Sequence, residues 1–339
     1  MTAASVPPAA SKFWLALLGL ADAAGQSWPG RDAWIAALSP ALVADLAPGL
    51  ALDREAEQQI RLFGRYQQAL QTQVLGWIAE AGLACVTMKG FAAAFLYYPT
   101  PASRLIGDLD ILIRPDEVTP LVALLQQRGF RFGSGIEKAW GFLSDASFMP
   151  LHSADRNCNV DIHVKPDSYP LALGLDTDAV FAKARAIMAG QRMALAPSAE
   201  HMALILIANL AKDKFAPDGL RKLLDLARLL RHEHAFSWPR VQERAERARL
   251  GKALHTTVFL LRSLGTPEEF LPANAGALRS SAARQLLADW CLQREPALLR
   301  RLQREWLLAA EPGVALRLLG RRVLGLLRPR PGVPEDIGG

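Results

Sequence analysis

Two acidic residues lie inside an otherwise apolar segment, residues 107–113 (GDLDILI). Side chains two positions apart on a β-strand share a face, so Asp108 and Asp110 project together, and their apolar neighbours predict a strand buried on both sides. A second segment of strand character, residues 159–164, carries Asp161. If the two strands are neighbours, three carboxylates converge, and their repulsion forbids full ionisation unless divalent cations lie between them. The pattern predicts a β-sheet that carries metal-dependent phosphate chemistry.

The same acids have a less specific interpretation. An isolated Asp-x-Asp pair on a strand is more often a solvated face than a metal site. Here the flanking residues Leu109 and Ile111 place the pair in a buried setting, where unpartnered carboxylates are costly. The third acid and the nearby Lys89-Gly90 favour the metal site.

The order of secondary-structure patterns predicts an α+β fold. Residues 53–81 repeat apolar side chains at helical spacing, and Gly82 follows as a C-cap. Strand patterns at 85–88, 108–113 and 159–164 alternate with helical stretches, and residues 185–195 predict a hairpin. After Pro197 only helical patterns follow, so we expect a small mixed sheet flanked by helices, then an all-helical region.

These patterns divide the chain into four predicted parts. Residues 1–52 form an N-terminal helical segment, and 53–196 form the core with the mixed sheet. Residues 197–328 form a C-terminal helical domain, with helices expected at 199–211, 219–231, 238–249, 252–264, 278–291, 297–309 and 314–327. The Pro- and Gly-rich residues 329–339 are expected to be a disordered tail.

Composition excludes several classes of protein. No apolar run approaches the roughly 20 residues that span a bilayer, so no transmembrane segment is expected. The three cysteines show no Cys-x-x-Cys spacing, which indicates neither a disulfide framework nor a zinc knuckle and favours a reducing cytoplasm. Residues 12–20 resemble a secretory signal weakly, but Asp22 interrupts them. The net charge of +6 suits a phosphate-bearing partner but does not require one.

The motifs together resemble a known superfamily. Lys89-Gly90, a helix that ends at Tyr97-Tyr98-Pro99, Arg104, the strand at 107–113 and Asp161-Ile162-His163 are similar to the polymerase-beta-like nucleotidyltransferases. The most similar subgroup is a bacterial one of uncharacterised nucleotidyltransferases, and the likeness covers about residues 53–265. In that superfamily, two acids of an Asp-x-Asp strand and a third acid on a neighbouring strand hold two Mg²⁺ ions. The resemblance implies these metal-binding and catalytic roles for Asp108, Asp110 and Asp161.

The resemblance also implies a nucleotide-binding set, namely Lys89, Gly90, Arg104 and Lys212. Lys89-Gly90 lies between a strand and a helix N-terminus, where backbone N–H groups and the helix dipole favour phosphate. Other superfamily members carry Gly-Ser at this place, so this chain lacks a hydroxyl that they direct at phosphate. Arg104 is equally well explained as half of a structural ion pair.

Two further residues have open interpretations. His163 shares a strand face with Asp161, so it is a candidate substrate contact, an ordering partner for the acid, or a hydrogen-bonded core histidine. Asp225 lies four residues after Arg221 and three before Arg228, which is the spacing of an ion-pair ladder on a helix. We prefer that structural interpretation to a substrate contact.

The predicted activity is a Mg²⁺- or Mn²⁺-dependent transfer of a nucleoside monophosphate from an NTP, such as ATP, to a hydroxyl or phosphate acceptor, with release of pyrophosphate. The acceptor is open among small molecules, sugar phosphates, peptides or proteins and RNA ends. Two alternatives remain: a catalytically silent nucleotide-binding scaffold, and a toxin-like nucleotidyltransferase that acts on tRNA. The C-terminal helix, with Arg317, Arg321, Arg322 and Arg328, allows a membrane-surface contact, although packing on the body is preferred.

Overall fold

The computed structural model describes residues 6–22, 25–50, 52–132, 146–273 and 280–327. Among these residues one seven-stranded mixed sheet has the order β3-β4-β5-β2-β1-β7-β6. The central pair, β2 and β5, is parallel, as is β1 with β7, and the other neighbours are antiparallel. The strands are β1 (Cys85–Thr87), β2 (Asp108–Ile113), β3 (Arg131–Phe132), β4 (Leu151–His152), β5 (Asn159–His163), β6 (Arg185–Ala189) and β7 (Arg192–Ala196).

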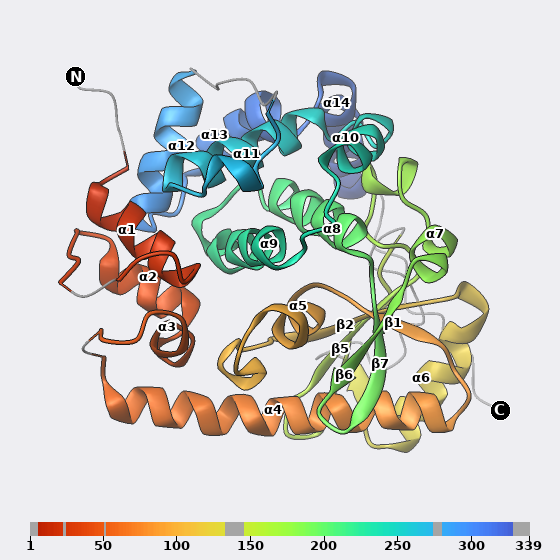
Figure 1. Cartoon of the computed structure of the whole chain (residues 1–339). Coiled ribbons are helices and arrows are strands. Elements are labelled where there is room, and N and C mark those ends of the chain that lie inside the picture. Colours follow the sequence, from red (N-terminus) through yellow and green to blue (C-terminus); the bar gives the residue numbers. More distant parts are fainter. Residues whose placement is uncertain (1–5, 23–24, 51, 133–145, 274–279, 328–339) are drawn as a thin grey trace.

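Helices make up most of the remaining described chain, which confirms the α+β fold. The helices are α1 (Pro8–Leu17), α2 (Arg31–Leu38), α3 (Pro40–Leu46), α4 (Arg54–Glu80), α5 (Lys89–Tyr97), α6 (Val118–Gln127), α7 (Thr177–Ala182), α8 (Ala199–Lys212), α9 (Leu220–His232), α10 (Trp238–Arg247), α11 (Gly251–Leu264), α12 (Ser281–Leu292), α13 (Leu298–Arg304) and α14 (Pro312–Leu327). A π-helical turn, η6 (Glu305–Ala309), continues α13. Figure 1 shows α4 along the bottom of the molecule and the helices from α8 onward in its upper half.

Local signals explain where several helices begin. Asp53 caps α4, because its side chain accepts hydrogen bonds from the backbone N–H groups of Glu55 and Ala56. Ser198 caps α8 in the same way. These are the starts that the sequence predicts at 53 and 199, whereas α7, a six-residue helix behind the cap Asp176, was not predicted.

The two faces of β2 pack against different parts of the protein. Leu109, Ile111 and Ile113 belong to a hydrophobic cluster with residues of α4 and α6. Leu112 on the opposite face belongs to the larger cluster, which includes α5, α8 and α9. Because side chains alternate along a strand, Asp108 and Asp110 share the face of Leu112 and point toward the helical half.

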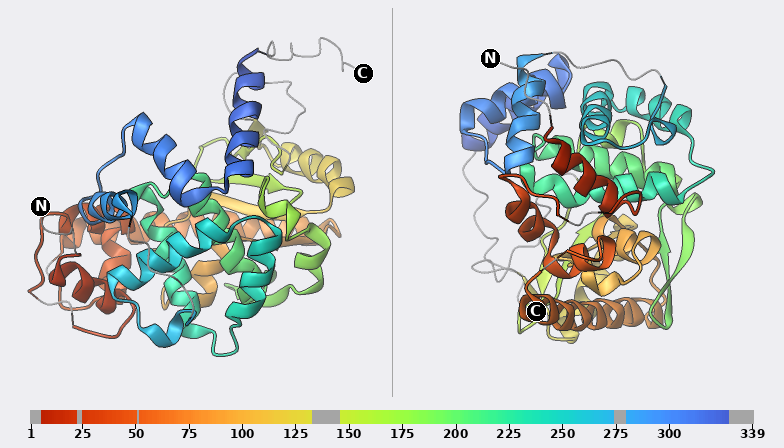
Figure 2. Two further views of the ribbon diagram at one scale, coloured as in Figure 1. Left: turned by 90° about the horizontal axis from the view of Figure 1, so that it is seen from above. Right: turned by 60° about the vertical axis from the view of Figure 1, so that its left-hand side comes forward.

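The N-terminal helices pack on the C-terminal ones, although they are far apart in the sequence. The Trp34 indole donates a hydrogen bond to the backbone carbonyl of Trp290 at 2.9 Å, and the Trp14 indole donates to the Thr266 hydroxyl at 2.9 Å. Both indoles are fully buried. Figure 2 shows the red and orange helices α1–α3 against this part of the molecule. The predicted domain boundaries at 52 and 196 stay a prediction.

The C-terminal helix α14 meets the body through its first half. Val314 and Ala315 are buried, whereas Leu316 and Leu319 are 58% and 43% exposed. The Arg317 guanidinium stacks over the Tyr169 ring, 4.4 Å from the ring centroid. Figure 2 (left) shows the helix extending away from the body, and the predicted tail at 329–339 lies outside the described residues. No described helix is both long enough and apolar enough to cross a bilayer.

Candidate active site

The acidic segments form the two parallel central strands, and their register brings the acids together. Asp110 on β2 lies directly opposite Asp161 on β5, and Asp108 lies opposite Asn159. The next inward-facing pair is Leu112 opposite His163. Opposite residues on neighbouring strands share a face, so the sheet presents Asp108, Asp110 and Asp161 on one surface.

One compact group of possible metal ligands results from this register. One ligand atom from each of Asp110, Asp161 and His163 lies within 4.8 Å of the others. His163 Nε2 is 3.0 Å from Asp110 Oδ1 and 3.2 Å from Asp161 Oδ2. Asp108 lies outside this group, and its Oδ1 accepts a hydrogen bond from the Asn159 amide at 2.5 Å.

His163 lies behind the acids. Its side chain is only 1% exposed, and its Nδ1 is 3.4 Å from the Ser147 hydroxyl. A side chain so enclosed contacts the two carboxylates and does not line the cleft described below. This geometry argues against a substrate contact and fits both the ordering role and the hydrogen-bonded core histidine.

Lys89, the first residue of α5, reaches the carboxylate of Asp110. It directly follows β1 and Met88, whose backbone N–H donates to the carbonyl of Asp110 at 2.9 Å, so the two segments are held side by side. Lys89 Nζ lies 2.5 Å from Asp110 Oδ1, and the residue has a φ of +50°. Positive φ is uncommon outside glycine and concentrates at functional sites.

Charge and burial shift the pKa values of these groups in different directions. Burial alone would raise the pKa of Asp110, but the charge of Lys89 and the hydrogen bond from His163 outweigh it and lower that pKa to about 2. Burial would lower the pKa of Lys89, yet the charge of Asp110 raises it above its ordinary value. The pKa of Asp108 is raised, first by burial and then by Asp110 and Asp161. The site therefore concentrates negative charge beside a fixed lysine.

The acids open into a cleft of about 410 Å³ between the sheet and the helices α8 and α9. Seven of the eight residues predicted from the sequence line this cleft; His163 is the exception. They are Asp108, Asp110, Asp161, Lys89, Gly90, Arg104 and Lys212. Arg221 and Lys222 at the start of α9 also line it and were not singled out as site residues from the sequence, because nothing in their spacing links them to the distant acids.

Arg104 and Asp225 form a buried ion pair in the lining of this cleft. Arg104 donates from Nε to Asp225 Oδ1 at 3.0 Å and from Nη2 to Oδ2 at 2.7 Å. The Tyr98 hydroxyl donates to the same Oδ1 at 2.7 Å. The sequence analysis predicted a structural ion pair for Asp225. The predicted partners, Arg221 and Arg228 on the same helix, were wrong, because the Asp225 carboxylate points away from α9 toward the segment before β2.

One acid that the sequence analysis did not consider lies beside the site. Asp167 follows β5 by four residues, is 3% exposed, and lies 3.5 Å from Lys212 Nζ. Burial raises its pKa, but the charges of Lys212 and Lys89 outweigh this and lower it. The feature of the sequence that could have identified Asp167 is its position six residues after Asp161, in the segment Lys165-Pro166-Asp167.

The donor set fits a hard divalent cation. Carboxylate oxygens are the ligands that Mg²⁺ and Mn²⁺ prefer, and an imidazole is accepted by Mn²⁺. The hydrogen bonds from His163 orient the two carboxylates that face the cleft.

A family model described as an uncharacterised nucleotidyltransferase matches residues 40–265, about two thirds of the chain. The chain belongs to this family. The match contains β1, β2 and β5 and every residue that lines the cleft, and it confirms the resemblance to nucleotidyltransferases. No curated protein matches the chain.

Proposed function

We propose that this nucleotidyltransferase moves a nucleoside monophosphate from an NTP to a hydroxyl or phosphate acceptor and releases pyrophosphate, with Mg²⁺ or Mn²⁺ held by Asp108, Asp110 and Asp161. The observation that carries the proposal is the register of β2 and β5, which sets Asp110 opposite Asp161 at the floor of a cleft lined by basic side chains.

The bound cations would lower the pKa of the attacking hydroxyl and neutralise negative charge on the leaving pyrophosphate. In our proposal Asp161, which is 26% exposed at the floor of the cleft, accepts the proton of the acceptor hydroxyl. The acceptor oxygen then bonds to the α-phosphorus as the bond to the bridging oxygen breaks. The electron pair of that bond leaves with pyrophosphate.

Basic groups of the chain would position the triphosphate. Lys89 Nζ is near enough to Asp110 to bridge that carboxylate and a phosphate oxygen. A Cβ at Gly90 would lie 3.3 Å from Arg104 Nη2, so glycine keeps the N-terminus of α5 open for close approach of phosphate. Lys212, Arg221 and Lys222 line the opposite wall of the cleft and add positive charge. Arg104 is held by Asp225 and shapes this wall.

The test is incubation of the full-length protein with each α-labelled NTP, Mg²⁺ or Mn²⁺, and cell extract. We expect label to enter one extract fraction, and a chelator to abolish the transfer. Asp110→Asn and Asp161→Asn should reduce transfer to background. Asp116→Asn, an exposed acid outside the cleft, is the matched control and should retain full activity.

The outcomes separate the alternatives. Metal-dependent NTP binding without transfer to any fraction would replace the proposal with a silent nucleotide-binding module. Label in tRNA, lost at high salt, would identify the acceptor as RNA. Full activity of Asp110→Asn would contradict the role of the acids altogether.

A further inference from the structure

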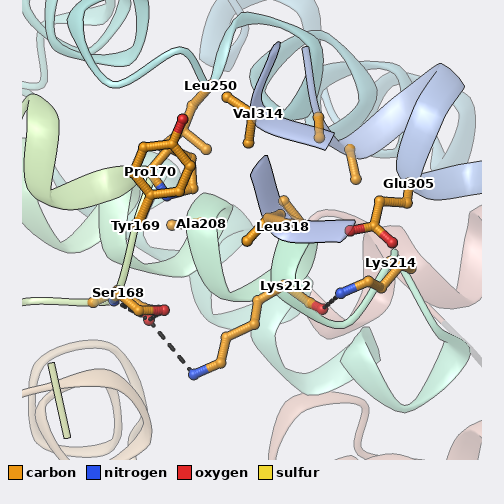
Figure 3. A pocket seen from close by; sticks show the side chains of 14 residues that line it. Ser168, Tyr169, Pro170, Ala208, Lys212, Lys214, Leu250, Glu305, Val314 and Leu318 are labelled. Atoms are coloured by element: carbon orange, nitrogen blue, oxygen red, sulfur yellow. Dashed lines mark hydrogen bonds and ion pairs between the residues drawn. The ribbon is translucent and has the colours of Figure 1, made fainter. Parts of the chain in front are cut away.

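A second cavity adjoins the cleft. It has a volume of about 150 Å³ and lies between α8, the segment after β5, the π-helical turn η6 and the start of α14. We call it the side pocket and define it by Tyr169, Ala208, Leu250, Val314 and Leu318, with Lys212 at its edge. Figure 3 shows these side chains around the pocket, with Tyr169 on one side and Leu318 on the other.

The walls of the side pocket are mainly apolar, and its lining also includes the charged residues Asp167, Lys212, Lys214 and Glu305. Val314 is 1% exposed and Leu250 is 2% exposed, so both belong to the packed interior that surrounds the pocket. An enclosed apolar cavity of about this volume holds a molecule of the size of benzene, which indicates the size of the group that the side pocket can hold. The side pocket therefore fits an aromatic ring or a branched aliphatic group, and is too small for a whole nucleotide.

Only a few side chains separate the side pocket from the cleft. Lys212 lines both cavities. Asp167 lines the side pocket, and its Oδ2 is 3.5 Å from the amide of Asn209, which lines the cleft. Lys212 Nζ lies 3.5 Å from the other oxygen of Asp167. A ligand that occupies both cavities would therefore cross this polar boundary.

The position of the side pocket favours the acceptor, and not the nucleotide, as the molecule that it binds. Tyr169 and Asp167 belong to the segment that directly follows β5, the strand of Asp161, which the proposed function assigns to the acceptor hydroxyl. The phosphate-binding groups Lys89 and Gly90 line the cleft and not the side pocket. The cleft, at about 410 Å³, lies within the usual range for a small-molecule site.

We propose that the side pocket binds the apolar group of the acceptor, an alcohol that carries an aromatic ring or a branched aliphatic group, and that its hydroxyl passes Lys212 into the cleft. This inference rests on the proposed function. The hydroxyl loses its proton to Asp161, its oxygen bonds to the α-phosphorus, and pyrophosphate leaves. Sugar phosphates without an apolar group would then be poor acceptors.

The test uses 4-fluorobenzyl alcohol as a probe, followed by its fluorine NMR signal on the full-length protein with and without Mg²⁺ and ATP. We expect saturable binding that persists with ATP present. Leu318→Phe, which fills the pocket from α14, should weaken binding by roughly tenfold or more. Leu316→Phe, on the exposed side of the same helix, is the matched control and should leave binding unchanged.

Three results would overturn the inference. They are the absence of saturable binding to the wild-type protein, equal binding by Leu318→Phe and Leu316→Phe, and displacement of the probe by ATP, which would identify a nucleobase site. If Leu318→Phe does not fold, Ala208→Phe replaces it in the binding assay, because this substitution fills the pocket from α8. Binding in the arm without Mg²⁺ and ATP involves no transfer, so it is independent of activity, and a failure of the proposed function is seen separately in the labelled-NTP assay.

Discussion

The buried pair of Arg104 and Asp225 is predicted to be a major determinant of stability, and Asp225→Asn is the perturbation that tests it. Asp225 is fully buried and accepts three hydrogen bonds, two from Arg104 and one from Tyr98. Arg104 is 7% exposed. Asparagine keeps the shape and one acceptor oxygen but removes the charge, so the guanidinium stays buried without a counter-ion.

The expected magnitude follows from that burial. Removing one partner of a buried ion pair destabilises a protein by about 3–5 kcal/mol, mainly because the remaining charge is uncompensated. Since asparagine still accepts a hydrogen bond, we expect the low end, about 3 kcal/mol, for Asp225→Asn. A double variant, Arg104→Met with Asp225→Leu, removes both charges and should be more stable than Asp225→Asn alone.

The assay is urea unfolding followed by tryptophan fluorescence and by circular dichroism. Glu243→Gln is the control, because the pair of Glu243 with Arg247 is exposed and its loss should leave the unfolding midpoint unchanged. The reasoning is refuted if Asp225→Asn unfolds at the same urea concentration as Glu243→Gln. It is also refuted if the double variant is less stable than Asp225→Asn.

Three further predictions concern packing, pH and thiol reactivity. Gly64→Ala should destabilise the protein by about 1–3 kcal/mol in thermal unfolding, because its Cβ would lie 2.0 Å from the carbonyl oxygen of Ala102. Burial lowers the pKa of His201 to about 4, so the histidine is neutral in the native state. The free energy of unfolding should be highest above about pH 6.5 and fall by up to about 3 kcal/mol as the pH drops to 4, because the unfolded state binds the proton more tightly. His201→Gln should reduce this dependence of stability on pH. Burial raises the pKa of the Cys85 thiol to about 12, and of the other two thiols similarly, so iodoacetamide at pH 8 should label the cysteines only after unfolding.

Each of these predictions has a result that would contradict it. Gly320→Ala is the packing control, since no heavy atom lies within 4 Å of its Cβ position, and equal effects at Gly64 and Gly320 would show that the clash is relieved. An unchanged pH dependence in His201→Gln would assign the acid sensitivity to other groups. Rapid alkylation of Cys85 in the native protein, seen by mass spectrometry, would show that the thiol is accessible.

Local patterns were sufficient to predict the elements around the site. The alternation of acidic and apolar residues from Asp108 to Ile113 predicted both the strand and the shared face of its two acids, because the period of a strand is two residues. The cap at Asp53 and the helical repeat after it predicted α4 to within one residue at each end. The same reasoning missed α7, which is too short for a helical repeat to be recognised.

The partners of the site residues could not be predicted in this way. Arg104 pairs with Asp225, which is 121 positions away, whereas helical spacing had pointed to Arg221 and Arg228. Asp167 meets Lys212 only because the segment after β5 turns toward the end of α8. Such contacts depend on how helices pack on the sheet, and side-chain spacing along one element carries no information about that packing.

By itself, the sequence determined which side chains share a strand face, where most helices begin and end, and that its motifs resemble those of nucleotidyltransferases. Only the tertiary structure decided the register that sets Asp110 opposite Asp161, the enclosure of His163 behind them, and the side pocket next to Lys212. The physical reason is that periodicity and capping act over a few residues, whereas strand register, buried ion pairs and cavities are set by the packing of segments that are distant in the chain.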